Sequence, residues 1–246
     1  MKVKDNIIPI NEYVDMTALL DVRSWPSLHE TITLGLMHAE VNYSYAGDPL
    51  EETKATTRGF WEAGWEASLK LSPGARSAFD KLSPALKRKF ACYHSGFYSL
   101  QTVPVYLQGA HKTRHLPEGV FPHPVNHKLF PELIEWVDKQ QLFESRGRII
   151  IFLSPPGFRT AWHRDGNDEQ VYDEEFLWFA PGRNKQLSLM NHMTSETRML
   201  PSYAIWFNSN QLHGVEPDNS HSYSVRVDGK FSERVKKFLR SRLIKL

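Results

Sequence analysis

The sequence predicts a mainly β protein with helices, an α+β fold whose core is an antiparallel sandwich or barrel. From residue 147 onward, short apolar or alternating segments recur, and turn residues such as Pro181-Gly182 and Asp218-Asn219 separate them. In residues 51–71 and 128–143 and after residue 232, apolar residues instead recur at helical spacing. No linker, internal repeat or low-complexity tract divides the 246 residues. We therefore expect a single domain over residues 1–246.

The first 95 residues are expected to form a mainly helical buttress. Aromatic and apolar residues follow helical spacing after residue 50. Ser72-Pro73 and Ser83-Pro84 each place a capping residue before a proline suited to the first helical turn. Helices are therefore expected over residues 51–71, 73–82 and 84–92. Ile7–Ile10 has the composition of a short edge strand, where a proline is tolerated, and the rest of residues 1–50 has no clear pattern.

Residues 96–231 are expected to form the β core. Ile149–Leu153 is a continuous apolar run, which is typical of a strand covered on both faces. A strand over 97–108 contains the interrupting Pro104, and a helix is expected over 128–143. Further strands are expected over residues 159–165, 176–180, 185–191, 197–200, 203–208, 212–216 and 223–231. After Ser232, a capping residue, residues 232–246 should form a last helix that buries Val235, Phe238, Leu239 and Leu243.

The composition favours a soluble globular protein. The chain is 41% hydrophobic and 12% aromatic, which is enough for a substantial core, and its net charge is only +2. That charge creates no strong field toward nucleic acid or a membrane, so we expect neither as a partner. A single cysteine, Cys92, fits a reducing compartment. No apolar run of signal-peptide or membrane-spanning length is present, and we expect a cytoplasmic location. The sequence leaves the oligomeric state open.

Candidate metal ligands lie in the predicted strands. His163 and Asp165 are two residues apart, so on a strand both side chains lie on the same face. His213 follows fifty residues after His163, on a different predicted strand. Two imidazoles and one carboxylate on one face of an ion form the ligand set of non-haem Fe(II) oxygenases. Arg226, thirteen residues later, supplies a guanidinium that can grip a carboxylate with two hydrogen bonds.

The order His163, Asp165, His213, Arg226 resembles the H-x-D…H…R pattern of the Fe(II)/2-oxoglutarate-dependent dioxygenases, over roughly residues 147–231. The resemblance implies a double-stranded β-helix, or jelly roll, in which the first three residues bind Fe(II). It also implies that 2-oxoglutarate binds the iron and docks its far carboxylate on Arg226. With O₂, oxidative decarboxylation would then release succinate and CO₂ and generate a ferryl species that abstracts hydrogen from the substrate.

The chain departs from the family pattern beside Arg226. Many members carry a serine two residues after the arginine, whereas this chain has Asp228 there and Ser224 two residues before. On a strand all three side chains face the same way, and a buried Arg226 needs an anion. Either a 2-oxoglutarate carboxylate or Asp228 can supply it, and we favour the former. Ser224 and Asn191 are candidates for binding the C1 carboxylate, on strand position alone.

The resemblance favours hydroxylation, because related halogenases have Gly or Ala where this chain has Asp165. We expect a small-molecule or amino-acid substrate. Residues 168–175 hold five acids, and they either attract a cationic substrate or form a solvated turn. The alternatives are an oxygenase acting on a protein or a nucleobase, a non-redox cupin-like metal-binding protein, and a metal-dependent isomerase or hydrolase. Desaturation, ring formation and demethylation also start from hydrogen abstraction and stay open.

Overall fold

The computed structural model describes residues 13–45, 77, 80–81, 99–108, 119–154, 160–165, 175–191, 194–216 and 220–243. The strand expected at residues 7–10 and the helices expected over 51–71 and 84–92 lie outside these residues. Of the helix expected over 73–82, only residues 77, 80 and 81 are described.

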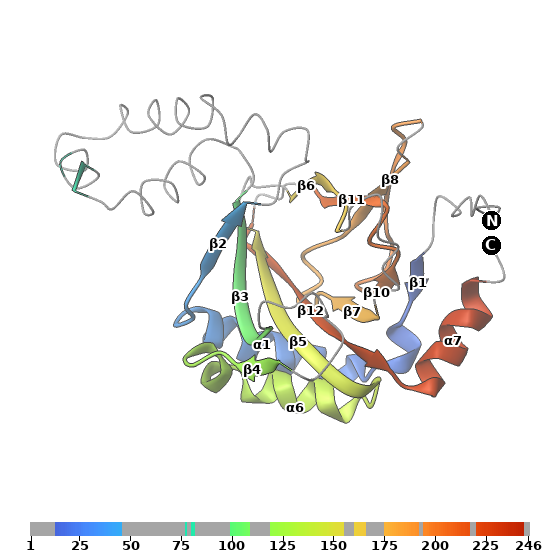
Figure 1. Cartoon of the computed structure of the whole chain (residues 1–246), viewed down its shortest axis with the longest axis horizontal. Helices are drawn as coiled ribbons and strands as arrows, with labels where there is room; N and C mark the ends of the chain where they lie inside the picture. The colour runs from blue at the N-terminus through green and yellow to red at the C-terminus, as the bar shows by residue number, and fades with distance from the viewer. Residues whose placement is uncertain are drawn as a thin grey trace.

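The eight strands β5 to β12 are divided equally between two antiparallel sheets (Figure 1). The larger sheet contains the order β10-β7-β12-β5, formed by Ala204–Phe207, Phe176–Phe179, Ser222–Phe231 and Phe143–Ser154. The smaller sheet has the order β6-β11-β8-β9, formed by Thr160–His163, Leu212–Val215, Ser188–Met190 and Thr197–Met199. Eight antiparallel strands divided in this way form a jelly roll, which confirms the expected fold class.

Four further strands extend the larger sheet. β1 (Tyr13–Asp15) pairs with β10 at one edge, and β3 (Ser99–Gln108) pairs with β5 on the other side. β2 (Asn42–Tyr45) and β4 (Val120–Pro122) both pair with β3. The register of β3 against β5 shifts between Pro104 and Tyr106, since proline has no N–H to donate to the ladder. The jelly-roll strands themselves therefore occupy residues 143–231 of the expected 96–231.

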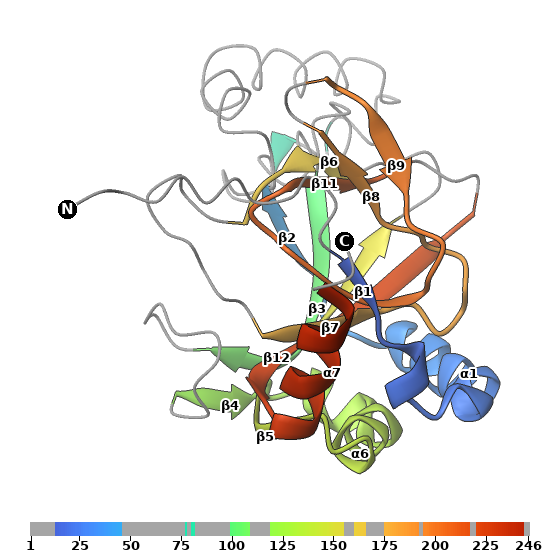
Figure 2. The ribbon, with the colours of Figure 1, turned by 90° about the vertical axis from the view of Figure 1, so that its right-hand side faces the viewer.

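The described helices cover the outer face of the larger sheet, on the side away from the smaller sheet (Figures 1 and 2). They are α1 (Trp25–Leu36), α6 (Pro131–Lys139) and α7 (Glu233–Leu243), with short 3₁₀ turns η1 (Thr17–Leu19), η2 (Val22–Ser24) and η3 (Asn126–Leu129). The helix expected over 128–143 begins at Pro131, a residue suited to the first turn. None of the described helices is long and apolar enough to span a membrane.

Strand β12 separates two apolar cores. Tyr223, Val225 and Val227 face the helices and join the core that includes Trp25, Leu28, Ile32, Leu133, Trp136 and Val235. A second core lies between the two sheets and contains Phe176, Trp178, Ala180, Leu187, Leu189, Leu200, Ile205, Phe207 and Val215. Ser224 and Arg226 line the cavity beside this second core. The alternation predicted for β12 is therefore confirmed, and it brings a serine and an arginine to the interior.

Gly229 of β12 lies too close to β5 to leave room for a side chain. A Cβ at this position would lie 2.5 Å from Cδ1 of Phe143 and 2.6 Å from the carbonyl oxygen of Ser145. Gly229→Ala should lower the free energy of unfolding by about 1–3 kcal/mol, because Phe143 must leave its stack on Phe231. Urea denaturation measures the loss. The neighbouring exposed variant Lys230→Ala is the control, and equal midpoints for the two variants would contradict the expected clash.

Candidate metal centre

The two histidines lie opposite each other on neighbouring strands. β6 and β11 pair antiparallel with His163 and His213 as direct partners, which puts both rings on one face of the smaller sheet. Their ring centroids are 4.2 Å apart. Asp165 follows β6, and its backbone N–H donates to the carbonyl oxygen of Ser209 at 3.0 Å. The pairing of two strands distant in sequence therefore completes the predicted constellation.

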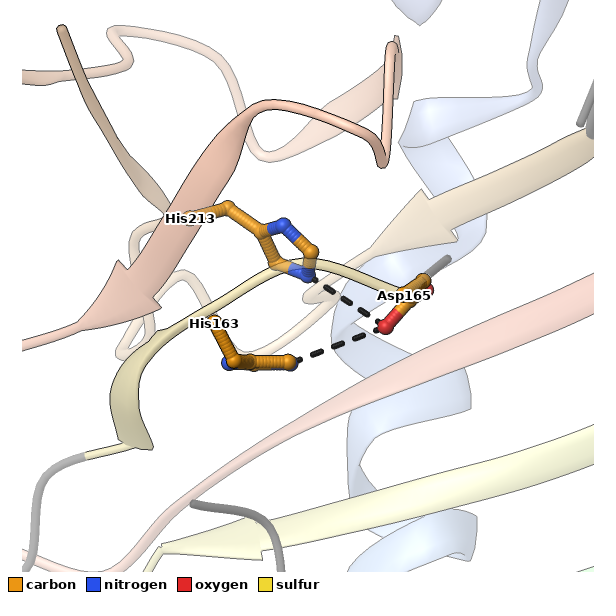
Figure 3. Close-up of side chains that lie close together, drawn as sticks. All are labelled: His163, Asp165 and His213. Carbon is orange, nitrogen blue, oxygen red and sulfur yellow. Dashed lines mark ion pairs between the residues drawn. The ribbon is translucent and has the colours of Figure 1, made fainter. Parts of the chain in front are cut away.

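The three side chains point toward one another (Figure 3). Oδ1 of Asp165 is 3.7 Å from Nε2 of His163 and 3.6 Å from Nε2 of His213. One donor atom from each residue lies within 4.8 Å of the others. His213 is buried, whereas His163 and Asp165 retain partial exposure. This grouping of two imidazoles and one carboxylate has the composition and spacing to hold a metal ion.

A backbone contact fixes the orientation of His213. Its Nδ1 lies 2.9 Å from the carbonyl oxygen of Gln211. A carbonyl oxygen only accepts hydrogen bonds, so Nδ1 carries the proton and Nε2 presents its lone pair toward Asp165. Metal-ligating histidines are commonly held in this way by an acceptor on the second nitrogen. The ring is therefore already oriented as a ligand.

Arg226 forms ion pairs with two protein carboxylates. Its Nη1 donates to Oδ2 of Asp165 at 2.5 Å, and its Nε donates to Oδ1 of Asp228 at 2.8 Å. Arg148 of β5 donates from Nε to the other oxygen of Asp228 at 2.7 Å. The guanidinium carbon lies 4.0 Å from the centroid of the Phe176 ring. Of the two partners considered from the sequence, the structure supplies Asp228, and it adds Asp165, which the sequence did not indicate.

The arginines keep both carboxylates ionised. Burial opposes the charged form of Asp165, but the positive charge of the Arg226 guanidinium holds its pKa well below the usual range. Burial likewise opposes the charge on Asp228, and Arg226 and Arg148 together lower its pKa. At neutral pH, Asp165 is therefore an anion with Oδ1 directed at the two imidazoles.

A cavity of about 90 Å³ adjoins the three residues. A single water needs only about 10–15 Å³ by this measure, so the cavity has room for a ligand of several heavy atoms. Its polar lining includes Thr160, Lys185, Ser224 and Arg226 besides the candidate ligands, and its apolar lining includes Phe152, Trp178, Leu187, Phe207 and Val215. The hydroxyl of Ser224 is buried and has no hydrogen-bond partner among the described residues. Such an orphaned group suits a site that receives a polar ligand.

Lys185 is a cavity residue that the sequence analysis missed. It is only 3% exposed, and its Nζ donates to the carbonyl oxygen of Phe152 at 3.1 Å. Burial lowers the pKa of its ammonium group to about 7. One signal was available in the sequence. Lys185 alternates with Leu187 and Leu189, two buried residues that lead into β8, which places a lysine in an inward-facing series.

Asn191 and Glu175, two further residues considered from the sequence, do not line the cavity. Asn191 follows β8 in a turn, where its Oδ1 accepts from the N–H of Thr194, and it does not line the cavity. Of the acidic stretch 168–175, only Glu175 is described. Its carboxylate accepts a hydrogen bond from the N–H of Phe231 and lies 3.9 Å from Nζ of Lys236. Glu175 thus faces the end of β12 and α7, and attraction of a cationic substrate by residues 168–174 stays a prediction.

Asp228 should be essential for stability. Asp228→Asn leaves Arg226 and Arg148 facing each other's charge without a buried anion between them, so the free energy of unfolding at pH 7 should fall by about 3–5 kcal/mol. Its pKa is lowered from 3.8 in the folded state, so the carboxylate stabilises the fold above that pH and this stabilisation is lost as the pH falls below it. The variant should therefore show a shallower loss of stability between about pH 5 and pH 3.

Denaturant titrations across this pH range measure both effects. Asp138→Asn is the matched control, because Asp138 also binds an arginine, Arg146, at 2.7 Å but is 52% exposed. Similar losses in the two variants would show that the Asp228 pairs are no stronger than a surface pair.

The geometry can be set beside known proteins. Similar solved structures include an oxidoreductase of the 2OG-Fe(II) oxygenase family from Burkholderia pseudomallei, 12% identical over 52% of this chain and 67% of its own, with a TM-score of 0.34. A prolyl-4-hydroxylase from Pseudomonas putida is 11% identical over 84% of this chain and 100% of its own, with a TM-score of 0.33. A cupin domain from Bordetella pertussis is 18% identical over 36% of this chain and 85% of its own, with a TM-score of 0.25.

A scan against protein-family models and a search of the curated proteins gave no match. The superfamily that the His163, Asp165, His213, Arg226 order resembles is represented among the similar structures. At these identities and TM-scores, the fold and the site rest on the strand order and the side-chain geometry described above.

Proposed function

We propose that the chain is an Fe(II)- and 2-oxoglutarate-dependent oxygenase that hydroxylates a small molecule or an amino acid. The observation that carries this proposal is the convergence of His163, Asp165 and His213 beside a buried cavity. A facial set of two histidines and one carboxylate leaves the other positions of the ion open, and this is the ligand set typical of non-haem Fe(II) oxygenases. The single cysteine fits a reducing compartment, and a cytoplasmic location is part of the proposal.

The residues present fit an iron ion. His213 presents Nε2 because Gln211 holds its other nitrogen, and Asp165 is kept anionic by Arg226. His163 lies opposite His213 on the paired strand and needs no rearrangement of the backbone to reach the same point. His163, Asp165 and His213 would therefore hold the metal through two nitrogens and one oxygen.

The cavity residues fit an anionic co-substrate. Arg226 and Lys185 bring two cations to one cavity, and Ser224 and Thr160 bring two hydroxyls. The Ser224 hydroxyl has no hydrogen-bond partner among the described residues. A dicarboxylate such as 2-oxoglutarate would satisfy both features through charge-assisted hydrogen bonds.

When bound together, Fe(II), 2-oxoglutarate and O₂ supply an oxidant strong enough to abstract hydrogen, with succinate and CO₂ as co-products. The chain's own residues direct this chemistry. Asp165 fills a ligand position, which favours hydroxylation over halogenation. Phe152, Trp178 and Phe207 form apolar walls that exclude water and strengthen the charges inside the cavity. Arg226 holds the second oxygen of Asp165, so the ligand keeps its orientation.

The main alternatives are a non-redox cupin-like protein and a metal-dependent isomerase or hydrolase. Both would use the same three residues to hold a metal, and Lys185 and Ser224 would then contact a substrate or ligand instead of 2-oxoglutarate. An oxygenase that acts on a protein or a nucleobase would share the metal centre and differ only in what enters the cavity mouth.

Metal binding should depend on His163. Under anaerobic conditions, Fe(II) added at about 100 times its dissociation constant should stabilise the wild-type protein by about 2.7 kcal/mol, because it binds only the folded state. His163→Ala should abolish this stabilisation, whereas His221→Ala should not, since His221 is exposed and does not line the cavity. Thermal unfolding with and without Fe(II) measures the effect. Equal stabilisation of His163→Ala would remove the proposed ligand set.

Co-substrate use separates an oxygenase from its rivals. With Fe(II), O₂ and 2-oxoglutarate, the wild-type protein should form succinate even without its prime substrate, at a low uncoupled rate, and His163→Ala should form none. Succinate is quantified by mass spectrometry, with metal-free protein as the blank. Tight Fe(II) binding with neither succinate formation nor any binding of 2-oxoglutarate would instead favour the isomerase, hydrolase or binding-only alternatives.

A further inference from the structure

Lys185 is a buried cation for which the described part of the chain supplies no carboxylate. The side chain is 3% exposed, and among the described residues its ammonium group has one acceptor, the Phe152 carbonyl oxygen. A buried ammonium that faces only a neutral carbonyl costs stability, because one hydrogen bond does not replace its hydration. A residue kept in such a place at the expense of stability is typical of a ligand-binding site.

Arg226, unlike Lys185, already has carboxylate partners among the residues described. In the described part of the chain, Arg226 forms ion pairs with Asp165 and Asp228, and Arg148 forms one with Asp228. A ligand carboxylate placed at Arg226 would compete with acids that the protein already provides. At Lys185 the same carboxylate would meet a cation that has no anion among the described residues.

Ser224 lies close to Lys185 in the framework of the larger sheet. Ser224 of β12 pairs directly with Phe152 of β5, and the carbonyl oxygen of Phe152 is the acceptor for Nζ of Lys185. Both Ser224 and Lys185 line the same cavity. Two independent observations therefore meet at one wall of the cavity, an unpartnered buried hydroxyl and a buried ammonium without a carboxylate.

We infer that Lys185 and Ser224 hold the distal carboxylate of 2-oxoglutarate, the one that does not bind the metal. The inference rests on the proposed function and departs from the expectation that Arg226 is the carboxylate anchor. Since one N–H of the Lys185 ammonium group is donated to Phe152, Lys185 can give two hydrogen bonds to a carboxylate and Ser224 can give one. In this arrangement Arg226 acts as a positioning residue for Asp165.

The test compares two 2-oxo acids that differ only at the distal end. 2-Oxopentanoate has the carbon chain of 2-oxoglutarate with a methyl group in place of the distal carboxylate. Calorimetric titration of the Fe(II)-loaded protein under anaerobic conditions gives both affinities. The wild-type protein should bind 2-oxoglutarate roughly 10- to 100-fold more tightly than 2-oxopentanoate, because a charge-assisted contact is lost in the latter. Lys185→Met should abolish that preference and leave the affinity for 2-oxopentanoate within about threefold of wild type.

Ser224→Ala gives a second, independent measurement. It should reduce the preference for 2-oxoglutarate by roughly 3- to 10-fold, since one hydrogen bond to a charged group is removed. Lys139→Met is the matched control, because Lys139 is 68% exposed on α6. Metal-free Lys185→Met should melt at or above the temperature of the wild-type protein, since a desolvated ammonium is replaced by a thioether of similar length. A lysine with a purely structural role would give the opposite shift.

The other outcomes are equally decisive. An undiminished preference for 2-oxoglutarate in both Lys185→Met and Ser224→Ala would overturn the inference, as would equal losses of both acids. Binding of neither acid by the Fe(II)-loaded wild-type protein would overturn the proposed function itself. Binding of 2-oxoglutarate with the preference lost only in Arg226→Met would return the distal carboxylate to Arg226 while leaving the proposed function intact.

Discussion

The candidate metal centre depends on one buried cation, the guanidinium of Arg226. The two histidines lie on the smaller sheet, whereas Arg226 lies in the centre of the larger one. Its 2.5 Å hydrogen bond to Asp165 therefore joins the ligand residues to the opposite sheet. Asp228, itself held by Arg148, keeps the guanidinium in place from behind. Because every residue in this series of ion pairs is buried or partly buried, removing one partner leaves an uncompensated charge. The ion pair that orients Asp165 is thus also a contact between the two sheets.

The two sheets of the jelly roll contribute different residues to the site. Helices cover the outer face of the larger sheet, where β12 presents Tyr223, Val225 and Val227, so the inner face of this strand can carry charged residues. Its neighbours β5 and β7 hold β12 in place. The smaller sheet consists of short strands, and its role at the site is to bring two distant histidines into a direct cross-strand pair. The apolar core between the sheets fills part of the interior and leaves the rest as the cavity. In that dry space, each charge on the cavity wall acts more strongly than it would in water.

Local patterns in the sequence predicted much of this arrangement. The strands from residue 143 onward follow alternation and turn residues, and spacing alone placed Ser224 and Arg226 on one face of a strand. His163 and Asp165 also converge, but β6 ends at His163, and Asp165 lies in a bend rather than in the strand expected over 159–165. What the sequence did not indicate depends on contacts between segments far apart in the chain. The bond from Arg226 to Asp165 joins two sheets, and α1 and β1 lie in a segment without clear periodicity.

Lys185 was missed because lysine is ordinarily exposed. Asn191 was chosen for its strand position, but β8 ends at Met190, and the turn that follows carries Asn191 away from the cavity.

Asp165 has two functions that cannot be separated in this chain. One of its oxygens faces the two imidazoles, and the other accepts the hydrogen bond from Arg226. In the resembled family, a small residue at this position opens a place for chloride on the metal. Here the same change would also remove an anion that pairs with Arg226, and among the described residues Asp228 would be left to pair with both guanidinium groups. The resulting excess of buried positive charge would weaken the framework on which the histidines depend. The carboxylate at position 165 therefore serves the electrostatics of the fold as well as the proposed ligand set.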